Sequence, residues 1–169
     1  VIQSGGGVKI ASNPGSGTVV TLYLPRSPAA VATSGGGPTA DLHPGSQETV
    51  LVVEDDEQVR PVAVEMIEEL GYRVVTAANG PEALARLNAG EPVDLLFSDI
   101  LMPGGISGVA LAAQARKIRR GVGVLLTSGY PAEGRTDLAR GEFPVLHKPY
   151  RRDKLAHMLR TTLDLRRTA

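Results

Sequence analysis

Five polar side chains sit directly after short apolar runs, and their types could bind a divalent cation and a phosphoryl group. They are Glu54, Asp55, Asp99, Thr127 and Lys148. Strands of a parallel sheet, buried on both faces, read as continuous apolar runs, and ligands of such sheets bind beyond the carboxyl ends of the strands. The sequence therefore predicts that three acids, a hydroxyl and an ammonium meet at one edge of a sheet.

These residue types suit metal-assisted phosphoryl transfer. Three neighbouring carboxylates repel one another, and a bound cation removes that repulsion. Hard oxygen ligands favour Mg²⁺, with Mn²⁺ as a substitute. With the metal present, one carboxylate can accept a phosphoryl group while the ammonium of Lys148 screens its charge. Thr127 can donate its hydroxyl to a phosphoryl oxygen.

Each of these residues also has a simpler interpretation when it is taken alone. Asp56 is expected only to cap the helix that follows it, and Glu54 or Asp55 could do the same. Thr127 fits a strand by its β propensity, and Lys148 could be a solvated lysine. The functional interpretation depends on finding all of these residues at strand ends in this order.

Composition limits the possible partners of the chain. Its 169 residues have a formal net charge of zero, which gives no electrostatic reason to bind nucleic acid or an anionic membrane. It has no cysteine, so disulfides and thiolate metal sites are excluded. We find no apolar stretch long enough for a membrane span and no signal segment, and we expect a cytoplasmic location.

The chain divides into three parts by composition. Residues 1–26 form a short glycine-rich head, and 49–166 carry all the regular strand and helix periodicity. Residues 27–48 are rich in Gly, Pro, Ser and Ala, so they cannot bury enough apolar surface to offset the entropy of ordering. We predict that they form a flexible linker.

The body of the chain alternates strand and helix patterns. The predicted strands are 50–53, 72–76, 93–98, 122–127 and 145–147, and the predicted helices are 57–70, 81–89, 107–119, 133–140 and 151–165. The helix at 133–140 has the weakest pattern. Five strands with intervening helices predict an α/β fold with a doubly wound parallel sheet.

At these residues the body resembles the receiver domain of two-component response regulators. The resemblance covers nearly all of residues 49–166 and rests on four motifs, at 51–56, 98–103, 126–130 and 147–150. It implies a flavodoxin-like receiver fold with strand order 2-1-3-4-5. It also implies a phosphohistidine donor, either a histidine kinase dimerisation domain or a histidine phosphotransfer protein.

The resemblance assigns a role to each residue of the site. Asp99 becomes the phosphoacceptor, and Glu54 and Asp55 form an acidic pocket in which Asp55 contacts Mg²⁺ directly. The backbone carbonyl of Leu101 completes the metal site. Thr127 and Lys148 become the switch pair, and the Lys148-Pro149 peptide bond is expected to be cis.

Three features depart from the family pattern. Val145 stands where many receivers carry an aromatic residue before the lysine, and the loop after Met102 is one residue longer than usual. Leu101 and Gly129, two positions beyond Asp99 and Thr127, have no polar side chain to orient water for attack on an acyl phosphate. We therefore expect slow self-dephosphorylation.

The head, residues 1–26, resembles the C-terminal end of the ATP-binding domain of sensor histidine kinases and is predicted to form a β-hairpin. The order of kinase end, linker and receiver implies a hybrid histidine kinase as the parent protein. The ATP-binding motifs of that family are missing, so we expect neither ATP binding nor autokinase activity, and enzyme status stays open. We expect output by phosphoryl relay or by contact.

Two other functions remain possible on this fold. In a haloacid-dehalogenase-like phosphatase, Asp55 would be the nucleophile and Glu57 the acid, but only Asp153 and Asp164 could supply the further acidic pair. The second alternative is an interaction module that works without phosphorylation.

Overall fold

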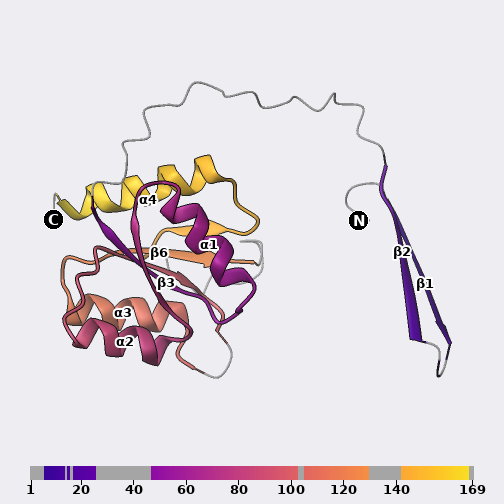
Figure 1. Cartoon of the computed structure of the whole chain (residues 1–169), viewed down its shortest axis with the longest axis horizontal. Coiled ribbons are helices and arrows are strands. Elements are labelled where there is room, and N and C mark those ends of the chain that lie inside the picture. The colour runs from indigo at the N-terminus through magenta and orange to yellow at the C-terminus, as the bar shows by residue number, and fades with distance from the viewer. Residues whose placement is uncertain are drawn as a thin grey trace. The chain divides into compact units, whose positions relative to one another are not determined.

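The computed structural model describes residues 6–13, 15, 17–25, 47–102, 105–129 and 142–167. The chain splits into two compact units, Val1–Ala40 and Asp41–Ala169 (Figure 1). The predicted helix at 133–140 and nearly all of the linker lie outside the described residues. Within the described ranges, no helix has the length and apolar character needed to cross a bilayer.

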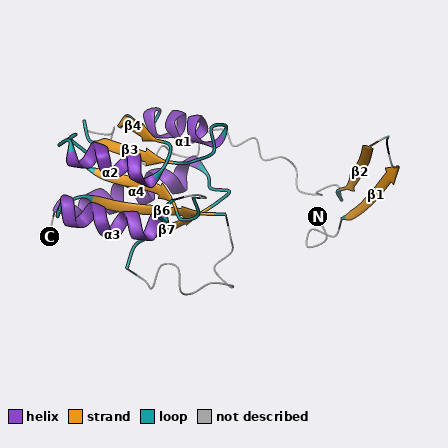
Figure 2. Ribbon diagram, turned by 90° about the horizontal axis from the view of Figure 1, so that it is seen from below, coloured by secondary structure: helices purple, strands orange, loops and turns teal. Residues whose placement is uncertain are grey.

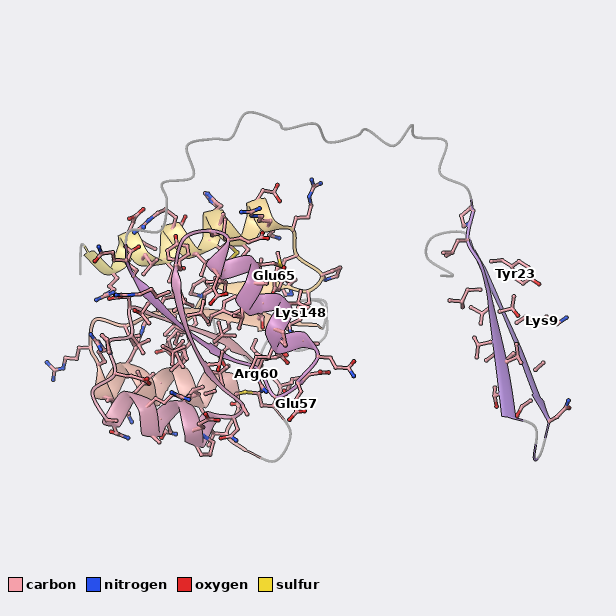
Figure 3. The ribbon with its side chains drawn as sticks, viewed as in Figure 1. Lys9, Tyr23, Glu57, Arg60, Glu65 and Lys148 are labelled. Carbon is pink, nitrogen blue, oxygen red and sulfur yellow. The ribbon has the colours of Figure 1, made fainter. Side chains whose placement is uncertain are left out.

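The first unit contains the predicted antiparallel hairpin. Strand β1 (Gly7–Asn13) pairs with β2 (Gly17–Tyr23). Side chains alternate between the two faces of a strand, so the register places Val8, Ile10, Val20 and Leu22 on one face. All four are exposed. Lys9 and Tyr23 project from the other face (Figure 3).

The second unit contains a five-stranded parallel sheet. Its strands are β3 (Thr49–Val53), β4 (Arg73–Ala77), β5 (Leu95–Asp99), β6 (Gly123–Ser128) and β7 (Val145–His147). Their order across the sheet is β4-β3-β5-β6-β7, and every neighbouring pair is parallel. Numbered within the unit this is 2-1-3-4-5, so the predicted fold is confirmed.

Among the described residues, four helices cover the two faces of the sheet. They are α1 (Val59–Glu68), α2 (Gly80–Asn88), α3 (Gly108–Ile118) and α4 (Arg152–Arg167). Helices α2 and α3 lie on one face, and α1 and α4 lie on the other (Figures 1 and 2). Each face has its own apolar cluster, and strands such as β3 contribute alternate residues to both. This double burial explains the continuous apolar runs of the sequence.

Local signals in the sequence set the helix ends. The side chain of Asn79 accepts a hydrogen bond from the backbone N–H of Glu82 at 2.9 Å, and Ser107 accepts one from Ala110 at 3.3 Å, so both are N-caps. Gly71 and Gly90 follow α1 and α2 with φ angles of 87° and 81°. This left-handed conformation ends a helix and favours glycine.

Not all of the apolar residues spaced three to four apart along α1 are buried, because Val59 and Val62 are exposed. Ala63 and Ile67 are buried, Leu70 just beyond the helix is buried as well, and Met66 packs against the same apolar cluster. The helix also begins two residues later than predicted. Pro61 therefore lies in the first turn of the helix, where its missing N–H has no helical partner to lose.

Two ion pairs tie α4 to the edge of the sheet where the strands begin. The guanidinium of Arg160 donates to both carboxylate oxygens of Glu48, at 3.1 and 3.0 Å. Arg166 pairs with Asp94, whose second oxygen accepts the backbone N–H of Thr49 at 2.8 Å. Both pairs are partly buried and join segments far apart in the sequence. They fix the last helix to the segments that lead into β3 and β5.

Candidate functional site

The register of the sheet brings the predicted residues to one edge. Val53 pairs with Ser98, so Glu54 and Asp99 follow side by side at the ends of β3 and β5. Asp99 pairs with Thr127 on β6. Lys148 follows β7 directly, and its backbone N–H donates to the carbonyl of Ser128 at 2.8 Å. The carboxyl ends of four strands thus carry the site.

The ammonium of Lys148 joins the two acids. Lys148 Nζ donates to Glu54 Oε2 at 2.7 Å and to Asp99 Oδ2 at 2.8 Å. The Lys148-Pro149 peptide bond is cis, as the resemblance implied. Figure 3 labels Lys148 among the side chains of the second unit. Lys148 therefore links Glu54 and Asp99, which precede it in the chain by 94 and 49 residues.

Burial strengthens these contacts. The side chains of Glu54, Asp99 and Lys148 are 8%, 14% and 23% exposed. Burial is the largest influence on Lys148 and acts to lower its pKa, but its hydrogen bonds to Asp99 and Glu54 together outweigh burial and raise the pKa above its ordinary value. Lys148 therefore stays charged and balances one of the two carboxylates.

Backbone groups orient both acids further. The N–H of Leu101 donates to Asp99 Oδ1 at 3.2 Å. Arg60, labelled in Figure 3, donates from Nη1 to the backbone carbonyl of Glu54 at 2.8 Å, which fixes the peptide that links Glu54 to Asp55. Arg60 was not among the residues predicted from the sequence, because nothing in its local pattern indicates a contact with the end of the preceding strand.

Asp55 lies at the same edge but is not drawn into the lysine cluster. It is half-buried, and its side chain has no hydrogen bond or ion pair with any other described residue. Asp56 Oδ1 accepts the backbone N–H groups of Gln58 and Val59 at 2.8 and 3.2 Å, so it caps the turn that precedes α1, whereas the N-cap position of the helix itself is Gln58. Asp55 is the third carboxylate at this edge, beside Glu54 and Asp99.

The carboxylates are chemically suited to a hard cation, although their present placement does not form a closed cage. Within the described ranges, no three His, Cys, Asp or Glu side chains are arranged to hold a metal ion. Lys148 occupies one oxygen each of Glu54 and Asp99. A divalent cation would use the remaining oxygens of this edge, which are the ligands that Mg²⁺ prefers.

Thr127 and Tyr150 complete the surroundings of the lysine. Thr127 is buried in β6 and is the register partner of both Asp99 and Leu146. The ring of Tyr150 packs edge-to-face on Phe97, with 6.2 Å between the centroids. Burial, the largest influence, raises the pKa of Tyr150, so the phenol stays neutral. Tyr150, two residues after Lys148, therefore packs against the apolar cluster on the face of the sheet that α1 and α4 cover.

Comparison with known proteins supports this interpretation of the fold and the motifs. Residues 50–160 match the family model described as "Response regulator receiver domain". A curated relative, the sensor kinase CckA of Brucella abortus, is 32% identical over 174 residues, which is 96% of this chain but 18% of that protein. The chain thus spans less than a fifth of that relative.

Two solved structures are similar to the second unit. The receiver domain of the hybrid histidine kinase CckA is 35% identical, covers 68% of this chain and 98% of its own, and superposes with a TM-score of 0.57. The response regulator TrrA of Thermotoga maritima, solved with Mg²⁺ and BeF, is 32% identical, covers 69% of this chain and 99% of its own, and has a TM-score of 0.61. Through residues 50–160, the chain belongs to the response regulator receiver family.

Proposed function

We propose that the second unit accepts a phosphoryl group on Asp99 from a phosphohistidine and signals by changing shape or by passing the group on. The observation that carries the proposal is the position of Lys148 Nζ, within hydrogen-bond distance of both Asp99 and Glu54. A structural ion pair would need one carboxylate. Two partly buried carboxylates around one ammonium leave a net negative site that is suited to a further cation.

Mg²⁺ is the cofactor we assign to this site, with Mn²⁺ as a possible substitute. Glu54, Asp55, Asp99 and the backbone carbonyl of Leu101 would hold it. The ion would screen the charge of the incoming phosphoryl oxygens. TrrA, which is similar to this unit, was solved with Mg²⁺ and BeF, and this supports the assignment.

The proposed step is a simple displacement. A carboxylate oxygen of Asp99 forms a bond to phosphorus while the P–N bond of the phosphohistidine breaks. The imidazole nitrogen leaves with the electron pair of that bond, and the product is an acyl phosphate. Lys148 moves its hydrogen bond from the carboxylate to a phosphoryl oxygen, and the hydroxyl of Thr127 donates to another. Loss of the Lys148 contact and movement of Thr127 would carry the signal.

We also propose that the parent protein is a hybrid histidine kinase. The alignment with CckA covers 96% of the chain, so it extends beyond the receiver into the hairpin region. We assign the hairpin to the end of a kinase ATP-binding domain, because its exposed apolar face of Val8, Ile10, Val20 and Leu22 is suited to burial against a further layer. The donor would then be a kinase dimerisation domain or a histidine phosphotransfer protein.

A mass measurement with matched variants tests the proposal. The chain is incubated with Mg²⁺ and acetyl phosphate or phosphoramidate, and its intact mass is followed. We expect the wild type to gain one phosphoryl group, and both Asp99→Asn and Asp55→Asn to gain none or to react far more slowly. Asp56→Asn is the control, since it removes an adjacent acid but keeps a capping side chain.

Other outcomes would identify the alternatives. Labelling of Asp99→Asn but not of Asp55→Asn would indicate a phosphatase-like nucleophile at Asp55. Failure of the wild type to react with any donor would indicate an interaction module that works without phosphorylation. Either result would refute the proposed function.

A further inference from the structure

We propose that Gly108 and Ser98 are positioning residues that hold the backbone of the phosphoacceptor Asp99 in place. Both act on one atom, the carbonyl oxygen of Asp99, from opposite directions in the chain. The inference rests on the proposed function of Asp99, because its consequence is the rate of phosphorylation. It also makes a structural claim that can be tested without a phosphodonor.

Gly108, the first residue of α3, leaves no room for a side chain. A Cβ atom built there would lie 2.1 Å from the carbonyl oxygen of Asp99, 2.9 Å from its carbonyl carbon and 3.0 Å from the Cα of Ile100. All three atoms belong to the backbone, so no rotamer change could relieve the overlap. The φ angle of Gly108 is not positive, so its conformation alone does not require glycine. Close approach to Asp99 is therefore the reason for glycine.

Helix α3 cannot simply move away from Asp99. The N–H of Gly108 donates to the carbonyl of Ile100 at 3.0 Å, which ties the start of the helix to the residue after Asp99. Further along, Leu111, Ala112 and Ala115 are fully buried against the sheet. Because interiors are closely packed, a clash at Gly108 would instead displace the end of β5.

Ser98 fixes the same carbonyl by a hydrogen bond. Its side chain is completely buried, and its Oγ donates to the carbonyl oxygen of Asp99 at 2.9 Å. A buried hydroxyl needs such a partner, and the oxygen in turn gains a donor that holds it towards the strand. Ser98 and Gly108 thus determine the orientation of the peptide that follows Asp99.

The position of that peptide decides where the carboxylate lies. Asp99 Oδ2 is 2.8 Å from Lys148 Nζ, and Oδ1 is 3.2 Å from the N–H of Leu101. A displacement of about 1 Å would break both hydrogen bonds. Misplacement of a reacting group on that scale costs about a hundredfold in rate.

Gly108→Ala in the full chain tests the inference, with Gly105→Ala as the matched control. A Cβ at Gly105 would meet its nearest atom, in Pro81, at 3.8 Å, which is an ordinary contact. Ile67→Val, in the buried face of α1, is a second control for loss of stability alone. Two quantities are measured: the rate of Asp99 phosphorylation by acetyl phosphate with Mg²⁺, and the NMR resonance of the Leu101 amide, which reports its hydrogen bond to Asp99.

We expect folded Gly108→Ala to react about a hundredfold more slowly and to show a shifted Leu101 amide, while both controls behave like the wild type. An unchanged rate or an unchanged Leu101 resonance in Gly108→Ala would overturn the inference. If Gly108→Ala does not fold, Ser98→Ala tests the inference instead. We expect its rate of Asp99 phosphorylation to fall about fivefold, which corresponds to the loss of one ordinary hydrogen bond. A wild-type rate in Ser98→Ala would overturn the inference.

The amide measurement separates this inference from the proposed function. If the wild type never becomes phosphorylated, the proposed function fails, and the Leu101 resonance still shows whether Gly108 positions Asp99. If the wild type reacts but Gly108→Ala reacts equally fast, only the positioning role fails.

Discussion

Asp99 and Thr127 are direct partners in the register of β5 and β6, so their side chains leave the sheet at the same level and on the same face. The N–H of Ile100 donates to the carbonyl of Thr127 at 2.9 Å, which locks this pairing one residue beyond Asp99. A phosphoryl group on Asp99 would therefore extend into the space next to the Thr127 hydroxyl. This pairing is the structural basis of the switch that we propose.

Thr127→Ala should separate phosphorylation from its consequence. We expect this variant to accept the phosphoryl group, because Asp99 and Lys148 are intact, but to lose the shift of backbone resonances that phosphorylation causes in β7 and at the start of α4. Thr127→Ser keeps the hydroxyl and should keep the response. Equal responses in all three proteins, measured by amide NMR before and after phosphorylation, would show that the hydroxyl has no part in the switch.

Lys148→Met removes the charge and keeps most of the side-chain length. Without the ammonium, Glu54 and Asp99 repel each other, and Lys148 no longer stabilises the transferring phosphoryl group. We expect phosphorylation with acetyl phosphate to slow by about a hundredfold to a thousandfold. Lys154→Met, which removes an exposed lysine of α4, is the control and should react like the wild type. A similar loss in both variants would point to net charge as the cause.

The phosphorylated form should be long-lived. Leu101 is partly exposed beside Asp99, and a Cβ at Gly129 would meet no atom within 4 Å, so neither position offers a group that could orient water. We expect Leu101→Asn to speed dephosphorylation about tenfold and Leu101→Met to leave it unchanged, as followed by intact mass after the donor is removed. Loss of phosphate from the wild type within seconds would contradict this expectation.

Asp94 should contribute to stability at neutral pH and lose that contribution in acid. Burial, the largest influence, acts to raise its pKa, but the Thr49 N–H and the Arg166 guanidinium together lower it below the ordinary 3.8. A group with a lowered folded pKa stabilises the fold above the unfolded value, and this stabilisation disappears as pH falls through the folded value. Asp94→Asn should therefore lower the free energy of unfolding by about 1 to 2 kcal/mol at neutral pH.

Urea unfolding at several pH values tests the direction of this pKa shift. The difference in free energy of unfolding between wild type and Asp94→Asn should shrink as pH falls below 3.8. Asp153→Asn, which removes an acid whose side chain is 78% exposed, is the control and should change little. A difference that grew in acid would mean that folding raises the pKa of Asp94 instead of lowering it.

The sequence predicted the strands well because buried parallel strands leave continuous apolar runs. Predictions for Glu54 and Asp99 followed from the position of these residues after such runs, and their proximity to Lys148 is now seen in the structure. The apolar spacing in α1 did not identify Ala63 as a core residue, because alanine contributes little to an apolar pattern although it faces the core.

Contacts between distant segments could not be read from local patterns. Arg116 belongs to α3, and nothing in the pattern of that helix indicates that its guanidinium carbon lies 4.7 Å from the centroid of the Phe143 ring. The pair of Glu48 and Arg160 joins residues 112 positions apart. Such contacts depend on how helices lie across the sheet, and no spacing rule within one element reveals them. The cis bond at Pro149 was expected only from the family resemblance, and the structure confirms it.

The most direct test of the central claim is to locate the phosphoryl group on the chain. The protein is phosphorylated by a histidine kinase or phosphotransfer protein and reduced with borohydride, which converts an aspartyl phosphate to homoserine, and the modified residue is then found by peptide mass spectrometry. The account predicts homoserine at position 99 and nowhere else. Homoserine at position 55, or a labelled chain with an unmodified Asp99, would contradict it.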